Sequence, residues 1–284
     1  MSWLVTGAGG MLGRDVLARL GDGAVGLTRR DLDVRDPYAV RAALSAHRPS
    51  VVVNCAAWTA VDEAETSEAA ALAVNGTAVR HLAEACAAAG CALVHISTDY
   101  VFGGDGSAPY AEGAVPTPRT AYGRTKLAGE RAVLEVLPER GYVVRTAWLY
   151  GAGGGNFVRT VIRLERERAH LDVVDDQRGQ PTWSADVARQ LVALVAADAA
   201  PGVYHATGAG DGTWCDLARE TFRLLGADPG RVRPTTSAAF PRPAPRPAYS
   251  VLGHDRWRAA GLAPPRDWRE ALPVALPALL TAGR

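Results

Sequence analysis

Short apolar runs alternate with longer stretches of helical periodicity through the first half of the chain. Continuous apolar runs are typical of strands in a parallel sheet, because helices cover both faces of such a sheet. Asp36-Pro37 begins one helical stretch, with proline in the first turn, where its missing N–H costs nothing. We expect strands at residues 3–6, 24–28, 51–54, 92–97 and 142–148, and helices at 11–20, 36–47, 68–89 and 120–137.

The rhythm becomes irregular after about Gly151. Helices are expected at residues 156–169, 183–196, 214–225 and 268–280, short strands at 171–174 and 202–205, and an extended, proline-dense segment at 241–247. The strand–helix alternation predicts an α/β fold with a doubly wound parallel sheet. We therefore expect residues 1–150 to form a sheet domain. Residues 151–284 would form mainly a smaller, discontinuous α/β lobe, with some segments returning to the first domain.

Composition narrows the class of protein. The chain has 284 residues, of which 48% are apolar and 21% charged, and its net charge is only +1. These values are ordinary for a soluble protein and argue against a broad nucleic-acid surface. No signal peptide is recognisable, and no apolar run reaches the ~20 residues of a membrane span. Since the four cysteines form no C-x-x-C pair, we expect reduced thiols in a cytoplasmic protein, without a disulfide frame or metal site.

A glycine-rich turn lies between the first strand and the first helix. Residues 7–13 read G-A-G-G-M-L-G, a G-x-x-G-x-x-G pattern. Glycine lets the backbone turn tightly and approach a pyrophosphate, whose charge the helix N-terminus stabilises. The alternative is a turn that serves packing alone. The strand before it and the helix after it favour a Rossmann-type dinucleotide site at Gly7, Gly10, Met11, Leu12 and Gly13.

The end of the second strand should contact the adenosine ribose. A site for NAD usually has an acidic residue there. This chain has Arg29 and Arg30 first, which can pair with a 2′-phosphate and favour NADPH, while Asp31 keeps NADH possible. Asp33 and Val34 follow and can reach the adenine edge, although capping of a turn is an equally good role for Asp33.

Tyr122 and Lys126 are four residues apart, so on a helix they share one face. A phenol has an unperturbed pKa near 10, and a neighbouring ammonium favours the phenolate and lowers that pKa. Such a tyrosine can protonate a carbonyl oxygen as hydride arrives at the carbon. The spacing alone is weak evidence, because the two residue types meet at it often by chance.

Five stretches together are more specific. The chain resembles the extended short-chain dehydrogenase/reductases and, within them, the dTDP-4-dehydrorhamnose reductase family. The resemblance rests on residues 7–13, 54–62 (N-C-A-A-W-T-A-V-D), 97–104 (S-T-D-Y-V-F-G-G), 122–130 (Y-G-R-T-K-L-A-G-E) and 176–182 (D-Q-R-G-Q-P-T). The first and fourth are shared across the superfamily, whereas the third and fifth are much narrower.

The resemblance implies a catalytic triad of Thr98, Tyr122 and Lys126. Thr98 would hold the substrate carbonyl, Tyr122 would supply the proton, and Lys126 would lower the tyrosine pKa and bind the nicotinamide ribose. The implied reaction is NADPH-dependent reduction of the C4 ketone of a dTDP-4-keto-6-deoxyhexose, foremost dTDP-4-dehydro-L-rhamnose. A sibling 4-ketoreductase of antibiotic biosynthesis and a non-catalytic NADP-binding regulatory subunit remain alternatives.

The resemblance also assigns residues around the two ligands. Ala56, Ala57 and Thr59 would line the coenzyme, with helix–sheet packing as the alternative, and Trp58 departs from the smaller aromatic or histidine expected there. Candidates for the substrate side are Thr98, Asp99, Tyr100, Trp148, Asn156, Gln177, Gln180 and Thr182.

Other roles on the substrate side are less specific. For Asn156, capping its own helix is the simpler role. Arg163, Arg178 and Arg246 are candidates for the diphosphate, and His205 is expected to be structural. The glutamates that hold magnesium at a dimer interface in some relatives find no clear match, and a monomer and a homodimer both stay open.

Overall fold

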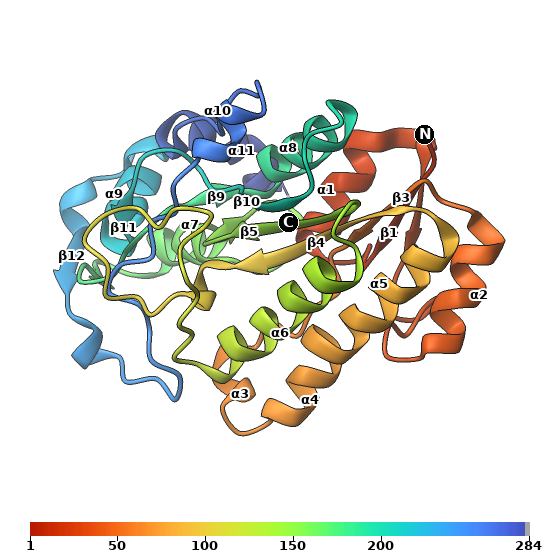
Figure 1. Ribbon diagram of the computed structural model, residues 1–284. Helices are drawn as coiled ribbons and strands as arrows, with labels where there is room; N and C mark the ends of the chain where they lie inside the picture. The colour runs from red at the N-terminus through yellow and green to blue at the C-terminus, as the bar shows by residue number, and fades with distance from the viewer. Residues whose placement is uncertain (282–284) are drawn as a thin grey trace.

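A six-stranded parallel sheet forms the centre of the molecule, in the order β10-β5-β4-β3-β1-β2 (Figure 1). The computed structural model describes residues 1–281. The chain leaves β1 for β2 on one side and then crosses to β3 on the other, which creates a crevice at the carboxyl ends of β1 and β3. The strands are β1 (Trp3–Thr6), β2 (Ala24–Leu27), β3 (Val51–Asn54), β4 (Ala92–Thr98), β5 (Gly141–Thr146) and β10 (Gly202–His205).

Helices cover both faces of this sheet, as the continuous apolar strands predict (Figure 1). Alternate strand residues enter opposite cores: Val51 and Val53 pack on one side, and Val52 on the other. The first core contains α1 (Met11–Leu20) and α8 (Ser184–Ala196), and the second contains α2 (Pro37–His47), α5 (Ala78–Ala89) and α6 (Ala121–Val136). The expected α/β fold with a doubly wound parallel sheet is confirmed.

Parts of the second half of the chain belong to the sheet domain. Strand β10 pairs with β5, and Leu191 and Leu194 of α8 share a core with Val16 of α1. The short helix α10 (Asp255–Ala259) adds Trp257 to the same core. A domain boundary at residue 150 would therefore separate β10, α8 and α10 from the sheet domain against which they pack.

The remaining lobe has two small cores of its own. Strands β7 (Leu171–Val174) and β12 (Val232–Thr235) pair in parallel beside α7 (Phe157–Glu167) and α9 (Trp214–Leu224). Helix α11 (Trp268–Thr281) closes the chain against α7. Two-residue strands complete the lobe: β6 (Leu149–Tyr150) with β9 (Thr182–Trp183), and β8 (Arg178–Gly179) with β11 (Gly212–Thr213).

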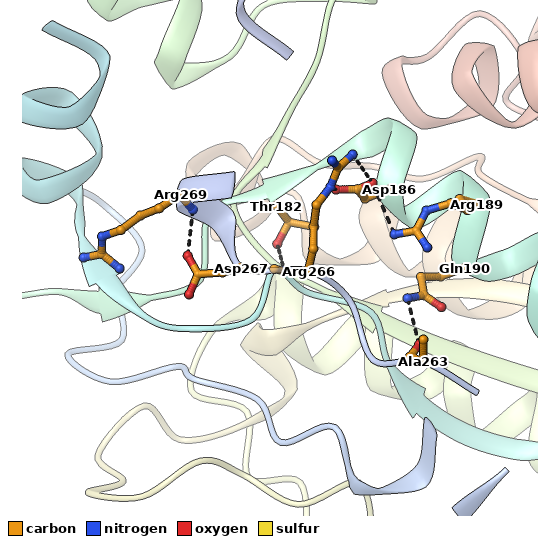
Figure 2. A network of polar contacts seen from close by, with 9 residues as sticks. Thr182, Asp186, Arg189, Gln190, Ala263, Arg266, Asp267 and Arg269 are labelled. Atoms are coloured by element: carbon orange, nitrogen blue, oxygen red, sulfur yellow. Dashed lines mark hydrogen bonds and ion pairs between the residues drawn. The ribbon is translucent and has the colours of Figure 1, made fainter. Parts of the chain in front are cut away.

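A polar network ties the segment before α11 to α8 (Figure 2). The Arg266 guanidinium donates two hydrogen bonds, of 2.7 and 2.8 Å, to the Asp186 carboxylate. Gln190 donates to the backbone oxygen of Ala263, and the Thr182 hydroxyl accepts from the Gly208 N–H. The contact with Gly208 holds Thr182, the last residue of the 176–182 motif.

The helix expected at residues 68–89 is interrupted. It consists of α4 (Glu68–Leu72), a π-helical turn at Ala73–Thr77, and α5. Buried Asn75 lies in the π-turn. Its side-chain oxygen accepts a hydrogen bond from the Trp58 N–H at 2.9 Å, and its amide nitrogen donates to the Trp58 backbone oxygen at 3.0 Å. The single continuous helix is therefore a wrong prediction, since an extra residue in the turn aims Asn75 at a loop.

The fifth strand also ends earlier than expected. β5 stops at Thr146, and Trp148 lies beyond it with φ at +45°, a left-handed conformation that is rare for a bulky residue. Several short elements had no clear sequence signal, among them α3 (Val61–Ala64), β12, α10 and the two-residue strands. Among the described residues, no helix has the length and apolarity that a membrane crossing requires.

Candidate active site

A cavity of about 570 Å³ lies at the crevice between β1 and β3. The loops after β1, β2 and β3 and one residue of the π-turn form its wall. We call it the N-terminal cavity. Its lining residues are Gly7, Gly9, Gly10, Thr28, Arg29, Arg30, Leu32, Asp33, Val34, Arg35, Cys55, Ala56, Ala57, Trp58 and Val74.

The glycine turn fits a dinucleotide. Gly7 has φ at +65°, and a Cβ there would lie 2.5 Å from the Ala56 nitrogen, so only glycine allows the two loops to meet. Gly10 is the N-cap of α1 and offers no side chain to its free N–H groups. Those donors suit a pyrophosphate. Met11, Leu12 and Gly13, which were expected at the coenzyme, form the first turn of α1 and do not line the cavity wall.

At the end of the cavity expected to hold the adenosine ribose, the arginines and the aspartate differ in their hydrogen bonding. Within residues 1–281, the side chains of Arg29 and Arg30 form no hydrogen bond or ion pair, although both line the cavity. The Asp31 carboxylate, by contrast, accepts from the Thr28 N–H (2.8 Å) and hydroxyl (2.6 Å). Because this acid closes its own turn, the charge left for a ligand is positive.

Asp33 and Val34 also line this cavity, at the place expected for the adenine. The Asp33 carboxylate is held by the Arg35 guanidinium, whose nearest N–O distance is 2.5 Å. That hydrogen bond lowers the pKa of Asp33 to about 2. Arg35 is a cavity residue that the sequence analysis missed.

The loop after β3 contributes small residues and one large ring. Ala56, Ala57 and Trp58 line the N-terminal cavity, whereas Thr59 is exposed beyond it. Trp58 thus faces the coenzyme side, and it also packs in a cluster with Tyr122. Asn75 clamps this loop, and its only sequence signal was a polar residue beside a glycine in an alanine-rich helix.

The three expected catalytic residues are brought together. Thr98 ends β4, and Tyr122 lies in the first turn of α6, whose N-cap is Thr120. The Tyr122 hydroxyl shares a hydrogen bond with Thr98, and its ring packs edge-on against Tyr100 with centroids 5.7 Å apart. Lys126, one turn further along α6, is only 2% exposed.

The electrostatics differ from the expectation in one respect. Burial raises the pKa of Tyr122 to about 12, with the hydrogen bond to Thr98 acting against the rise and the Asp99 charge adding to it. The Lys126 amine instead donates to the Ile96 backbone oxygen at 2.6 Å. Lys126 is not among the groups that shift the pKa of Tyr122 in this arrangement, and its effect on the tyrosine stays a prediction.

Asp99 is a buried acid beside the catalytic residues. Burial raises its pKa to about 6, against the hydrogen bond from Thr98 that lowers it. Its carboxylate accepts from the Thr98 hydroxyl at 3.0 Å. Asp99 thus orients Thr98 and lies among the buried side chains rather than on the wall of either cavity.

A second cavity, of about 670 Å³, opens on the other side of Tyr100. We call it the lobe cavity. It is mostly apolar, with cations at one end. Its lining residues are Tyr100, Trp148, Phe157, Thr160, Val161, Leu164, Leu171, Asp172, Val173, Val174, Gln177, Trp214, Ser237, Phe240, Arg242, Arg246 and Pro247.

An aromatic pair forms part of this wall. The Trp148 ring stacks on Trp214, with centroids 3.7 Å apart and planes 9° from parallel. The Trp214 indole N–H donates to the Gln177 side-chain oxygen, and the Gln177 amide donates to Ser237. Trp148 and Gln177 therefore lie in the cavity as expected, while Trp214 was read only as the start of a helix.

Three expected substrate residues are occupied elsewhere. The Asn156 side chain caps α7 by accepting from the Arg159 N–H at 3.1 Å, the simpler of its two roles. Gln180 bonds the Leu252 backbone on both sides and accepts from Thr207, and Thr182 donates to the Gln180 backbone oxygen. None of the three lines the lobe cavity, so their contacts support structural roles.

The structure also separates the candidate arginines. Arg163 pairs with Glu167 and Arg178 with Asp211, both away from the cavity wall. Arg246 lines the wall and donates to Asp62 at 2.8 Å. Arg242, which the sequence analysis missed, lies 4.0 Å from the same carboxylate.

His205 is the structural histidine that its position suggested. Its Nδ1 lies 3.0 Å from the Gly253 oxygen, and its Nε2 lies 3.3 Å from the Arg145 guanidinium. Burial lowers the pKa of His205 to about 3. The ring is therefore neutral, with Nδ1 donating and Nε2 accepting.

Comparisons with known proteins agree with this geometry. The model of the RmlD substrate binding domain family matches residues 1–280. A dTDP-4-dehydrorhamnose reductase of Streptomyces griseus is 62% identical over 99% of this chain and 95% of its own length. A dTDP-4-keto-6-deoxy-D-glucose reductase of Streptomyces niveus is 58% identical over 98% of this chain and 97% of its own.

Among solved structures, a dTDP-4-dehydrorhamnose reductase of Bacillus anthracis in complex with NADP superposes with a TM-score of 0.93. It is 35% identical and covers 97% of this chain and 99% of its own. Fold, site geometry and sequence agree along nearly the whole chain. The chain therefore belongs to the RmlD substrate binding domain family.

Proposed function

We propose that this protein is an NADPH-dependent reductase of the C4 ketone of a dTDP-linked 4-keto-6-deoxyhexose. The observation that carries the proposal is the packing of Tyr122 against one residue from the wall of each cavity. Trp58 joins its ring to the N-terminal cavity, and Tyr100 joins it to the lobe cavity. A proton donor at this seam can serve a coenzyme on one side and a ketone on the other.

The residues of the N-terminal cavity fit NADPH. The uncapped α1 N-terminus and the close approach of Gly7 to Ala56 suit the pyrophosphate. Arg29 and Arg30 are available for a 2′-phosphate, while Asp31 is engaged with Thr28 and leaves no free acid for an unphosphorylated ribose. NADPH, when bound, supplies the hydride.

Tyr122 and Thr98 complete the chemistry at the ketone oxygen. With its pKa at about 12, Tyr122 is protonated at neutral pH and is present as the donor that a reduction needs. The Thr98 hydroxyl can donate to the same oxygen when its one proton turns away from the Asp99 carboxylate, which it bonds at 3.0 Å. Six residue pairs between β4 and β5 fix Thr98 at the end of β4.

The lobe cavity is suited to a nucleotide-linked sugar. Its aromatic and aliphatic wall can take a base and sugar, and Arg242 and Arg246 can meet a diphosphate. The names of the similar Streptomyces proteins support the class of substrate. We take dTDP-4-dehydro-L-rhamnose as the first candidate, and a sibling 4-ketoreductase acting on another 4-keto-6-deoxyhexose as the second.

The test is NADPH oxidation by the purified protein, measured separately with dTDP-4-dehydro-L-rhamnose and dTDP-4-keto-6-deoxy-D-glucose. We expect turnover with at least one of them, and proton NMR of the product gives the configuration at C4. Oxidation without sugar serves as the control. No turnover with either sugar, together with tight binding to another enzyme of the pathway, would favour a regulatory subunit.

We further propose that residues 1–150 supply the coenzyme and catalytic parts, with most of residues 151–284 supplying the substrate side. We place the protein in the cytoplasm, as a monomer or homodimer. The four unpaired cysteines are compatible with a reducing compartment.

A further inference from the structure

A buried polar chain runs from β1 to Lys126, behind the catalytic residues. The Thr6 hydroxyl donates to the Asn54 side-chain oxygen at 2.7 Å, and the Asn54 amide nitrogen lies 3.1 Å from Nδ1 of His95. His95 Nε2 lies 3.3 Å from the Lys126 amine. All four side chains are at most 2% exposed, so water does not complete their hydrogen bonds.

The direction of these hydrogen bonds can be worked out from one end. The Asn54 oxygen also accepts from the Ala56 N–H at 3.2 Å, and a backbone N–H can only donate. This contact fixes which end of the amide is oxygen, so the NH₂ group faces His95. Because that group has no acceptor lone pair, His95 Nδ1 must accept and carries no proton.

The neutral ring then carries its proton on Nε2. That N–H points at the Lys126 amine, which can accept it only when the amine is uncharged. The His95 ring is fully buried, so no solvent molecule offers this N–H another acceptor. An ammonium at Lys126 would face an N–H instead of a lone pair.

We propose that His95 is a positioning residue that favours the neutral amine form of Lys126 at mildly alkaline pH, so that binding of the coenzyme is coupled to uptake of a proton by Lys126. The inference rests on the proposed function only for the identity of the coenzyme. The proton comes from solvent, and Lys126 gains it on leaving His95 for the bound coenzyme.

The other groups around Lys126 agree with this assignment. His95 of β4, Cys55 after β3 and Glu130 of α6 are the titratable groups beside Lys126, and the Arg145 guanidinium of β5 pairs with Glu130 at 2.7 Å. Burial lowers the pKa of Lys126 to about 8, with Glu130 acting against the shift, so the neutral amine is the main form above that pH. Burial also raises the pKa of Cys55 to about 12, so its thiol stays neutral.

The tautomer can be read directly by ¹⁵N NMR of histidine-labelled protein without coenzyme. The chain has six histidines, and the His95→Gln variant identifies the signal of His95. We expect a ring protonated at Nε2 and bare at Nδ1 from pH 6 to pH 9. An Nδ1–H tautomer, or an imidazolium, would overturn the proposal.

The Asn54→Asp variant removes the N–H donor that faces His95 Nδ1 while almost keeping the shape of the side chain. Its carboxylate still accepts from Thr6 and Ala56 but cannot donate, so His95 should move its proton to Nδ1 and turn a lone pair toward Lys126. The added charge also favours an ammonium. The tautomer switch in NMR is therefore measured in the same variant.

Proton uptake on NADPH binding completes the test, measured by calorimetry at pH 8.5 in two buffers of different ionisation enthalpy. The 2′-phosphate is fully ionised at this pH. We expect the wild type to take up roughly half a proton or more per site, and Asn54→Asp and Lys126→Met to take up close to none. Equal uptake by the wild type and Lys126→Met, or unchanged uptake in an Asn54→Asp protein with a switched tautomer, would refute the coupling.

These readouts are separable from the reaction itself. The expected tautomer and uptake with no ketone reduction would reject the proposed function and leave the role of His95 standing. Reduction of the ketone with no proton uptake would reject the role of His95 and leave the proposed function standing.

Discussion

Tyr122 packs against Trp58 of the N-terminal cavity and Tyr100 of the lobe cavity, and these two cavities are built in different ways. Three loops that follow β1, β2 and β3, together with Val74 of the π-turn, form the N-terminal cavity, all within the first 74 residues. The lobe cavity draws on segments between Tyr100 and Pro247, which come from seven or more separate stretches of the chain. The proposed coenzyme site is thus built from a short local stretch of the chain. The proposed sugar-nucleotide site is built from distant segments that the fold brings together.

Removing the proton donor at the seam should have the largest effect. Tyr122→Phe keeps the ring, its packing on Tyr100 and both cavities, but it loses the hydroxyl bonded to Thr98. We expect kcat to fall by about 10²-fold or more, with NADPH affinity unchanged. Steady-state rates and a fluorescence titration with NADPH measure the two quantities. Wild-type rates in the variant would remove Tyr122 from the mechanism.

A charge change confined to the N-terminal cavity should come next. Arg29→Ala with Arg30→Ala should weaken NADPH binding by about 10- to 100-fold, the loss of one or two charge-assisted hydrogen bonds, and should spare NADH. The Kd values of both coenzymes measure the effect. Arg131→Ala removes an exposed arginine of α6 and is the matched control. Equal losses for NADPH and NADH would mean that neither residue contacts the 2′-phosphate.

A charge change in the lobe cavity should act on the sugar nucleotide alone. Arg246→Ala should raise KM for the substrate by about tenfold, since one charge-assisted contact with the diphosphate is lost. Asp62→Asn is the matched control, because it breaks the same 2.8 Å ion pair and leaves the arginine in place.

The two variants separate binding from packing. If Arg246 contacts substrate, Asp62→Asn keeps the wild-type KM or lowers it. A rise of the same size in both variants would show that Arg246 only anchors the segment around Ala244. NADPH affinity should change in neither.

The last effect concerns the stability of the fold near Tyr122 and leaves catalysis aside. Asp99 has a folded-state pKa raised to about 6, so its charged form destabilises the fold, and this cost is absent below pH 4 and complete above pH 6. Two pKa units correspond to about 3 kcal/mol at most. Asp99→Asn should therefore flatten the loss of stability between pH 4 and pH 7, as measured by denaturant unfolding. An unchanged pH dependence would place the titration elsewhere.

The contrast also explains how far the sequence alone could reach. The glycine turn, Arg29, Arg30 and the Tyr122–Lys126 spacing are local patterns whose geometry follows from one strand, one turn or one helix. Trp214 and Arg242 were missed because nothing near them in sequence points to a ligand. Gln180 and Thr182 belong to a family-specific motif, but their hydrogen bonds lie inside the protein, so a narrow motif did not mean contact with substrate.

Buried electrostatics were equally inaccessible from spacing. A separation of four residues placed Tyr122 and Lys126 on one helix, yet the amine is directed to β4 by Ile96 and His95. Asn75 acts through a π-turn that interrupts an otherwise uniform alanine-rich helix. Both depend on tertiary contacts between residues 17 to 50 positions apart.

The most direct test of the central claim follows the hydrogen itself. NADPH carrying deuterium at nicotinamide C4 is incubated with the wild-type protein and a dTDP-4-keto-6-deoxyhexose, and the product is examined by NMR and mass spectrometry. The account predicts one deuterium at C4 of the sugar, from one face of the coenzyme. A product without deuterium at C4, or no product while NADPH remains bound, would contradict it.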